Sequence, residues 1–334
     1  MILVSFGTRP EYIKIKPLIS ALEGKIPFKL LFTGQHTDLL SNIDYEGVIR
    51  LKIEDGDNRL DSIVSSVMNQ SHIFDAITAV LVQGDTTSVF AIALAAFHRK
   101  IKIIHLEAGL RTYDRNNPYP EEFNRQAVSK MADIHLCPTE VSAQNLKNEK
   151  VQGTIHVVGN TVLDNLVNIV PTRTDAVVIT LHRRENHDKM AHWFSEIDKL
   201  AEKYEGIYKF ILPIHPNPNV IKHRDILKHV CVSQPYQYDQ FVALLASSAY
   251  VITDSGGLQE ETAFMRKRSI VCRKTTERPE GLKEFSVLCP EPENLIPLFD
   301  EMIMKPEPTG ECPYGDGRSA ERIVDFLLEK LQWR

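Results

Sequence analysis

The chain has 334 residues, of which 43% are apolar and 25% are charged, and its formal net charge is -5. This balance is typical of a globular protein and excludes the collagen-like, disordered and disulfide-scaffold classes. The negative charge argues against a nucleic-acid binder, because such proteins neutralise phosphates with a basic excess. The length favours two domains with sizeable cores.

The apolar segments and the cysteines bear on the location of the protein. Residues 2–6 are apolar without a basic lead, which predicts a first strand rather than a signal peptide. The longest nearly apolar run, 89–97, is about half as long as a membrane-spanning helix. We therefore expect a cytoplasmic protein without a membrane segment. Reduced thiols fit the five cysteines, which form no C-x-x-C pair: Cys137, Cys231, Cys272, Cys289 and Cys312.

Short apolar runs alternate with stretches of helical period along the whole chain. This alternation predicts an α/β protein with two doubly wound parallel sheets. The polar, proline-containing segment 170–175 has the composition of a linker, which gives an N-terminal domain at 1–170 and a second at 176–317. The predicted strands are 2–6, 28–33, 78–82, 102–106, 134–137 and 155–158 in the first half, and 177–181, 210–212, 230–232, 250–252 and 269–271 in the second.

The tail at 318–334 is predicted to be a helix with one apolar face, and a return to the N-terminal domain is one arrangement open to it. That face carries Ile323, Phe326, Leu327 and Leu331.

Candidate catalytic residues follow the predicted strands of the first half. Asp85 follows strand 78–82, Glu107 follows strand 102–106, and Glu121 comes shortly after. Ligands of open α/β sheets lie beyond the carboxyl ends of the strands, so three acidic side chains in successive loops suit acid/base chemistry. Each of these acidic residues, taken singly, can instead have a structural role. For Asp85 that role would be the capping of the next helix. After the first strand, Arg9 and Lys14 can reach a phosphate or carboxylate, or can be solvated charges.

The second half supplies groups suited to an anion. His182 and His215 each end a predicted strand. Ser255 and Gly256 open a helix whose first N–H groups can hold a diphosphate. Glu261, one and a half turns further, can reach a sugar hydroxyl or instead be a buried carboxylate between helices, and Arg278 adds a cation.

Several common cofactor motifs are missing from the sequence. No G-x-G-x-x-G follows a strand, and no G-x-x-x-x-G-K-[ST] occurs, so neither a nicotinamide site nor a P-loop is indicated. No H-E-x-x-H or H-x-x-E-H pattern is present. We therefore expect no cofactor and no metal.

Taken together, these blocks resemble the non-hydrolysing UDP-N-acetylglucosamine 2-epimerases, which have the GT-B architecture of two Rossmann-like domains facing across a cleft. The resemblance covers nearly the whole chain. It rests on 7–11, 84–87, 105–112, 120–122, 159–162, 182–186, 254–261, 275–280 and 313–317.

The resemblance implies a role for each matching position. Uracil would lie against Phe241, the ribose hydroxyls on Glu261, and the diphosphate on Ser255 and Gly256. Arg9 and His215 match further nucleotide-side or cleft positions, and Lys14 matches a lysine near the sugar. The implied catalytic groups are Asp85, Glu107, Glu121 and His182. The resemblance does not assign which carboxylate is the acid and which is the base. Members of the family are commonly homodimers that serve polysaccharide biosynthesis, with a UDP-sugar as substrate.

The chemistry of C2 independently favours one route. The C2 hydrogen is not next to a carbonyl, and oxidation at C3 would need a nicotinamide. The remaining route expels UDP as C2 loses its proton, which leaves a 2-acetamidoglucal to which UDP adds back. This route needs cations and helix dipoles on the diphosphate, and a base and an acid on opposite faces of C2.

The chain also departs from the family pattern. It is some tens of residues shorter than a typical relative, and Tyr12, Lys16 and Arg115 are unusual at their positions. A 2-epimerase of a UDP-2,3-diacetamido-uronic acid is the main alternative, in which Lys16 or Arg115 meets the extra carboxylate. A hydrolysing epimerase, a GT-B glycosyltransferase and an idle nucleotide-sugar sensor are further alternatives. The resemblance also leaves open a second, regulatory UDP-N-acetylglucosamine site, for which the matching positions are near Gln35, His36, Arg183 and His215.

Overall fold

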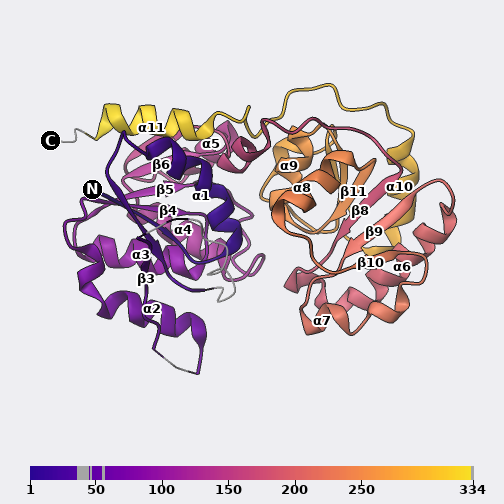
Figure 1. Ribbon diagram of the computed structural model, residues 1–334, viewed down its shortest axis with the longest axis horizontal. Helices are drawn as coiled ribbons and strands as arrows, with labels where there is room; N and C mark the ends of the chain where they lie inside the picture. Colours follow the sequence, from indigo (N-terminus) through magenta and orange to yellow (C-terminus); the bar gives the residue numbers. More distant parts are fainter. Residues whose placement is uncertain (36–44, 46, 55–56, 332–334) are drawn as a thin grey trace. The chain divides into compact units, whose positions relative to one another are not determined.

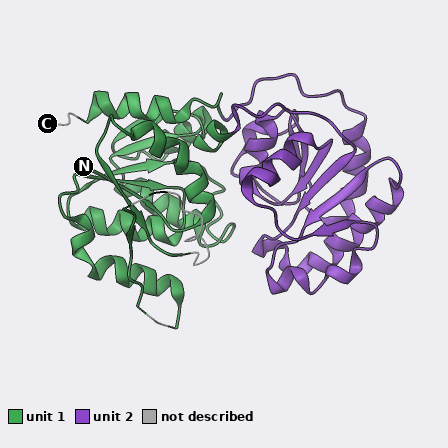
Figure 2. Ribbon diagram, in the orientation of Figure 1, with its two compact units in different colours: residues 1–165, 315–334 green, residues 166–314 purple. Residues whose placement is uncertain are grey.

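The computed structural model describes residues 1–35, 45, 47–54 and 57–331. The chain divides into two compact units (Figure 2), one made of residues 1–165 and 315–334 and the other of residues 166–314. Each unit has a sheet with helices on its faces (Figure 1). The predicted α/β class with two doubly wound sheets is confirmed.

In the described part of the first unit, seven parallel strands form one sheet in the order β3-β2-β1-β4-β5-β6-β7. The central strands are buried on both faces, which explains their continuous apolar sequences. The strands are β1 (Ile2–Phe6), β2 (Phe28–Phe32), β3 (Ile49–Arg50), β4 (Ala79–Gln83), β5 (Lys102–Leu106), β6 (Ile134–Cys137) and β7 (Thr154–Val157). The helices are α1 (Arg9–Leu22), α2 (Arg59–Asn69), α3 (Thr87–His98), α4 (Glu121–Met131), α5 (Glu140–Asn148) and α11 (Ser319–Lys330).

The second unit repeats this plan with six parallel strands in the order β10-β9-β8-β11-β12-β13. In both sheets, the first three strands of the unit are added one after another toward one edge, and the fourth strand pairs with the other side of the first. This is the Rossmann strand order. The strands are β8 (Ala176–Thr180), β9 (Lys209–Pro213), β10 (Cys231–Ser233), β11 (Tyr250–Thr253), β12 (Arg268–Val271) and β13 (Ser286–Leu288). The helices are α6 (Met190–Lys203), α7 (Pro218–Ile221), α8 (Tyr238–Ser247), α9 (Gly256–Phe264) and α10 (Leu295–Ile303).

All of the predicted strands are present, within one or two residues of their expected bounds. Two strands were not predicted, β3 and β13, and both lie at the edges of their sheets. The segment 170–175, which we expected to link two domains, is hydrogen-bonded within the second unit. There the N–H groups of Thr172 and Thr174 donate to the carbonyls of Ala246 and Ser247, at 2.9 and 2.8 Å.

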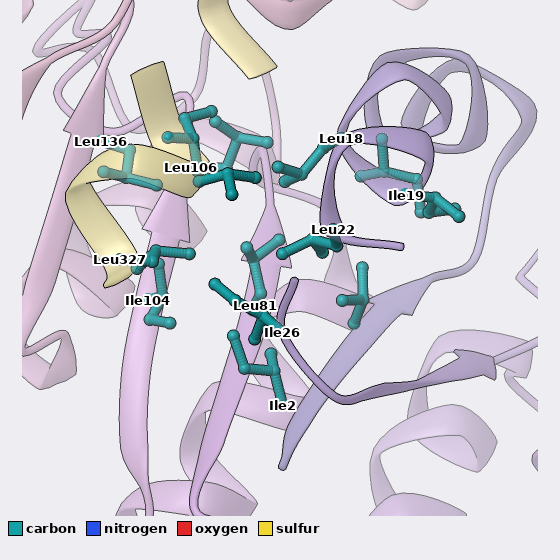
Figure 3. Close-up of a cluster of buried hydrophobic side chains, with 14 of the residues drawn as sticks. Ile2, Leu18, Ile19, Leu22, Ile26, Leu81, Ile104, Leu106, Leu136 and Leu327 are labelled. Carbon is teal, nitrogen blue, oxygen red and sulfur yellow. The ribbon is translucent and has the colours of Figure 1, made fainter. Parts of the chain in front are cut away.

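Helix α11 is part of the first unit, although it ends the described chain (Figure 2). It packs along α1, and its apolar face joins the core that β1, β4, β5 and β6 share. Figure 3 shows Leu327 of α11 beside Ile104 in this core, with Leu18 and Leu22 of α1 on the same side of the sheet. The apolar stripe of the tail is thus buried. Among the helices of the described ranges, none combines the length and the apolarity that a membrane span would need.

Candidate active site

Both sheets have a topological switch point, where the strand order reverses and ligands of such folds bind. In the first unit it lies between β1 and β4, and in the second between β8 and β11. The loops that leave these strands at their carboxyl ends carry Arg9, Asp85, His182 and Ser255. Within each unit, two of the predicted site residues therefore lie at the edge of the sheet where ligands are expected.

Glu107 of the first unit is held by three side chains. It follows β5 with a φ of 65°, an unusual left-handed conformation for a residue other than glycine. The ammonium of Lys14 lies 2.7 and 2.6 Å from its two carboxylate oxygens. The amides of Gln83 and Asn160 donate to it at 2.5 and 3.0 Å. A cation and two amides thus compensate this buried charge, and Lys14 is placed against Glu107 itself.

Asp85 follows β4 and is paired with Arg125 of α4, whose guanidinium donates to its carboxylate. Its backbone carbonyl accepts a 2.9 Å hydrogen bond from the side chain of Asn124. The cap of the following helix is Thr86 and not Asp85, because the Thr86 hydroxyl accepts from the N–H of Val89. The capping role is therefore filled without the Asp85 carboxylate.

The first turn of α4 carries Glu121 and Glu122, which have different surroundings. Glu121 begins the helix and is half-buried. Glu122 is fully buried and accepts from the N–H groups of Thr112 and Tyr113, each at 3.0 Å, and from Arg125 at 3.2 Å. Arg125 consequently joins the loop after β4, the loop after β5 and α4 into one network.

The loop between β1 and α1 is fixed by Glu11. Its buried carboxylate accepts from the N–H groups of Gly7 and Thr8, at 2.8 and 2.6 Å, and from the hydroxyl of Thr86 at 2.7 Å. Burial raises the pKa of Glu11, although these hydrogen bonds oppose the rise. Arg9, the first residue of α1, is half-buried on this loop.

The buried side chain of His105 supports the same edge of the sheet. It is completely buried in β5, and its Nε2 donates to the carbonyl of Gly84 at 2.8 Å. Burial lowers the pKa of His105 to about 3, so the ring is neutral at physiological pH. It holds the Gly84 turn, where φ is 81°, directly before Asp85.

At the switch point of the second unit, Asp254 joins the loops after β8 and β11. Its Oδ2 accepts from the N–H groups of His182 and Arg183, at 2.9 and 2.8 Å, and from Asn186 at 3.1 Å. The ring of His182 stacks on that of His215, with 5.0 Å between centroids and 17° between planes. The two histidines predicted from separate strands are therefore in contact.

Helix α9 begins with Gly256, and Ser255 is its N-cap residue. Arg278 lies against this end of the helix, because a Cβ on Gly256 would come within 2.5 Å of its Nη1. The guanidinium of Arg278 forms buried ion pairs with Glu260, at 2.9 Å, and with Glu277. Carboxylates of the protein thus already contact the cation that we expected for a phosphate.

Glu261 lies on the buried side of α9, where the hydroxyl of Tyr238 donates to it at 3.2 Å. Burial, the charge of Glu261 and this hydrogen bond raise the pKa of Tyr238. Phe241 lies one turn further along α8 and is half-buried. Glu261 is therefore adjacent to the first turn of α8, which carries Tyr238 and Phe241.

Sequence reasoning missed the side chains that hold the candidates in place. Gln83, Arg125, Asn160, Asp254 and Glu277 each contact a predicted site residue. Asn160, Asp254 and Glu277 lie within blocks that carried the resemblance, which was the available signal, whereas Gln83 and Arg125 lie just outside such blocks. Among the residues placed by the structure, no group of three or more His, Cys, Asp and Glu side chains could hold a metal ion.

A family model described as UDP-N-acetylglucosamine 2-epimerase matches residues 20–328 of the chain. The chain belongs to this family. A UDP-N-acetylglucosamine 2-epimerase of Neisseria meningitidis is 36% identical over 370 residues, which covers 98% of this chain and 99% of the relative. Because the alignment is longer than the 334 residues of the chain, this relative carries additional residues, as the sequence had indicated.

Solved structures of the 2-epimerase family have the same fold. The Neisseria meningitidis UDP-GlcNAc 2-epimerase bound to UDP-GlcNAc matches with a TM-score of 0.89 and 34% identity, over 98% of this chain and 100% of that one. The Methanocaldococcus jannaschii UDP-GlcNAc 2-epimerase in complex with UDP-GlcNAc and UDP matches with a TM-score of 0.83 and 30% identity, over 98% and 99%. The predicted GT-B fold class is thereby confirmed.

Proposed function

We propose that this protein catalyses the reversible epimerisation of UDP-N-acetylglucosamine at C2, which gives UDP-N-acetylmannosamine. The carrying observation is the full-length match to a 2-epimerase solved with UDP-GlcNAc. The placement of acidic side chains at the switch point of the first unit, and of an anion-binding helix start at that of the second, supports the same activity.

The reaction proceeds by elimination and addition. A carboxylate takes the proton from C2, the C–H electron pair forms the C1–C2 double bond, and the C1–O bond breaks with its electrons on UDP. The intermediate is a 2-acetamidoglucal. An acid then returns a proton to the opposite face of C2, and the β-phosphate oxygen of UDP rejoins C1. Atoms and electrons balance without an oxidant.

Carboxylates of the first unit carry the proton. Asp85 or Glu107 acts on one face of C2 and Glu121 on the other. Asp85 pairs with Arg125 and Glu107 pairs with Lys14, so each of these two carboxylates has a cation beside it. The shared network of Asp85, Arg125 and α4 couples the position of Glu121 to that of Asp85.

Groups of the second unit bind the nucleotide. The start of α9, at Ser255 and Gly256, holds the diphosphate, and Glu261 binds the ribose. Phe241 lies against the uracil. His182 assists the leaving phosphate, and Arg9, Lys14, His215 and Arg278 complete the set of substrate-binding residues. Positive charge and helix dipoles at the diphosphate favour departure of UDP.

The test is proton NMR of the purified protein with UDP-N-acetylglucosamine in deuterium oxide. We expect UDP-N-acetylmannosamine with deuterium at C2, and no such product from an Asp85→Asn control. Free N-acetylmannosamine with UDP would identify a hydrolysing epimerase instead. An unchanged spectrum would overturn the proposal and make a UDP-2,3-diacetamido-uronic acid the next substrate to test.

Two further proposals concern the setting of the enzyme. The five cysteines, without a C-x-x-C pair, fit a cytoplasmic location. The resemblance to dimeric epimerases supports a homodimer. Light scattering after size exclusion should give twice the chain mass of 38.0 kDa, and a monomer mass would refute the dimer.

A further inference from the structure

A buried carboxylate lies directly behind His182 in the second unit. Asp254 has no exposed surface, and its Oδ2 is fully used by the N–H groups of His182 and Arg183 and by the amide of Asn186. Its Oδ1 is also buried but accepts no hydrogen bond from any residue that the structure places. Nδ1 of His182 lies 3.7 Å from this Oδ1.

This distance is too long for a hydrogen bond but within range of a charge interaction. A buried acceptor without a donor is rare, because the lost hydration is uncompensated. A small rotation of the His182 ring would bring its Nδ1–H onto Oδ1. The other ring nitrogen, Nε2, would then point away from Asp254, as in sites where a carboxylate orients an imidazole.

We propose that Asp254 is a positioning residue for His182: through Nδ1 it orients the imidazole, and its charge stabilises the protonated form that faces the diphosphate of the substrate. This inference rests on the proposed function, in which His182 assists the departure of UDP. Asp254 acts only through His182, and its contacts to the backbone of residues 182 and 183 fix the loop that carries the ring.

The charged and titratable groups around His182 give the sign of the effect. The pKa of His182 lies below its ordinary value, because burial lowers it more than the charge of Asp254 raises it, and Arg183 and His187 lower it further. His215 stacks on the ring from the loop after β9, and its Nδ1 accepts from the N–H of Asn217 at 3.2 Å, which occupies the lone pair of a neutral ring. Asp254 is thus a carboxylate beside this ring that favours its cation.

The experiment is an NMR titration of the histidine Cε1–H signals in the full-length protein, with His182→Gln to assign the signal. In Asp254→Asn, the titration of His182 should move to lower pH by about one unit, the lower end of the effect of an opposite charge within 6 Å. If protonated His182 is required, the high-pH limb of kcat/KM for epimerisation should move by the same amount. At a pH above both midpoints, turnover would fall about tenfold.

Asp198→Asn is a matched control in the same unit. Asp198 is paired with His229 at 3.0 Å and raises the pKa of that histidine. The control should therefore lower the titration of His229 and leave that of His182 in place. A shift of both histidines in both variants would indicate a general effect of charge and overturn the specific pairing.

A measurement on the wild-type protein covers the case in which Asp254→Asn does not fold. The carboxyl carbon signal of Asp254 should move through the pH range in which His182 titrates, and its failure to move would overturn the inference. The titration does not depend on the sugar chemistry. Wild-type protein that fails to epimerise would therefore refute the proposed function alone, whereas a shifted titration with an unchanged pH profile would refute the role of Asp254 in turnover.

Discussion

Glu11 offers a sharp test of how the loop after β1 is held. Its carboxylate accepts two backbone N–H groups, of Gly7 and Thr8, and the hydroxyl of Thr86 from the loop after β4. Only 3% of the residue is exposed, so water does not replace these contacts when they are lost. Glu11→Ala removes all three acceptor contacts, whereas Glu11→Gln can retain them, with its oxygen toward the backbone and its amide toward Thr86.

The expected cost follows from the donors left behind. A buried donor without a partner costs about 1–3 kcal/mol, which gives about 2–6 kcal/mol for the two N–H groups. Removal of a buried charge offsets part of this cost, because burial already raises the pKa of Glu11. We therefore expect Glu11→Ala to lower the local free energy of unfolding by about 2–4 kcal/mol and Glu11→Gln by less than about 1 kcal/mol.

Hydrogen exchange of peptides that span β1 and the start of α1 measures this local stability. Exchange should accelerate strongly in Glu11→Ala and little in Glu11→Gln. The raised pKa also sets a pH dependence, because the folded protein binds the proton of Glu11 more tightly than the unfolded chain does. The free energy of unfolding should therefore fall as the pH rises from the ordinary pKa of a glutamate to the raised pKa of Glu11. Glu11→Gln should lack this decline. Equal exchange in the two variants would refute the role of the three contacts.

Three other substitutions test the core, the backbone and the chemistry. Leu327→Ala should destabilise the first unit by about 3–5 kcal/mol in urea unfolding, and a loss below about 1 kcal/mol would place α11 outside its core. Gly109→Ala should prevent folding, as seen by circular dichroism, because φ is 89° and the new Cβ would lie 2.2 Å from the carbonyl oxygen of Ser142; a native spectrum would contradict this. Asp85→Asn should slow epimerisation by about 10²–10⁴-fold with UDP affinity, by calorimetry, unchanged within a few-fold, whereas lost UDP binding would mark a structural role.

The sequence was sufficient for the fold because strands that are buried on both faces carry continuous apolar runs, which stand out between stretches of helical period. Strands β3 and β13 were missed because they have two and three residues at the sheet edges, too few for a period to be seen. Edge strands are paired on one side only, so their side chains need not be uniformly apolar. Tertiary pairing, and not local sequence, creates these two strands.

The candidate site was predicted as residue positions but not as interactions. Arg278 and Glu260 are 18 residues apart, and only the fold brings them to 2.9 Å. The local sequence around Arg278 does not show whether its guanidinium is available to a phosphate or is paired with carboxylates of the protein. The same holds for Asp85, whose partner Arg125 lies 40 residues further along. Motifs identify which side chains reach the sheet edge, whereas their charge state depends on partners that sequence spacing does not reveal.

The return of α11 to the first unit affects the order in which the protein can fold during synthesis. The first unit is made of two stretches of sequence, and the whole second unit is translated between them. At about 5–20 residues per second, roughly 150 residues delay the arrival of α11 by about 10–30 s. Until then, the core cluster shared by β1, α1 and β5 lacks the helix that completes it. The second unit is continuous, so it can be complete on the ribosome while the first still exposes an apolar face that chaperones can bind.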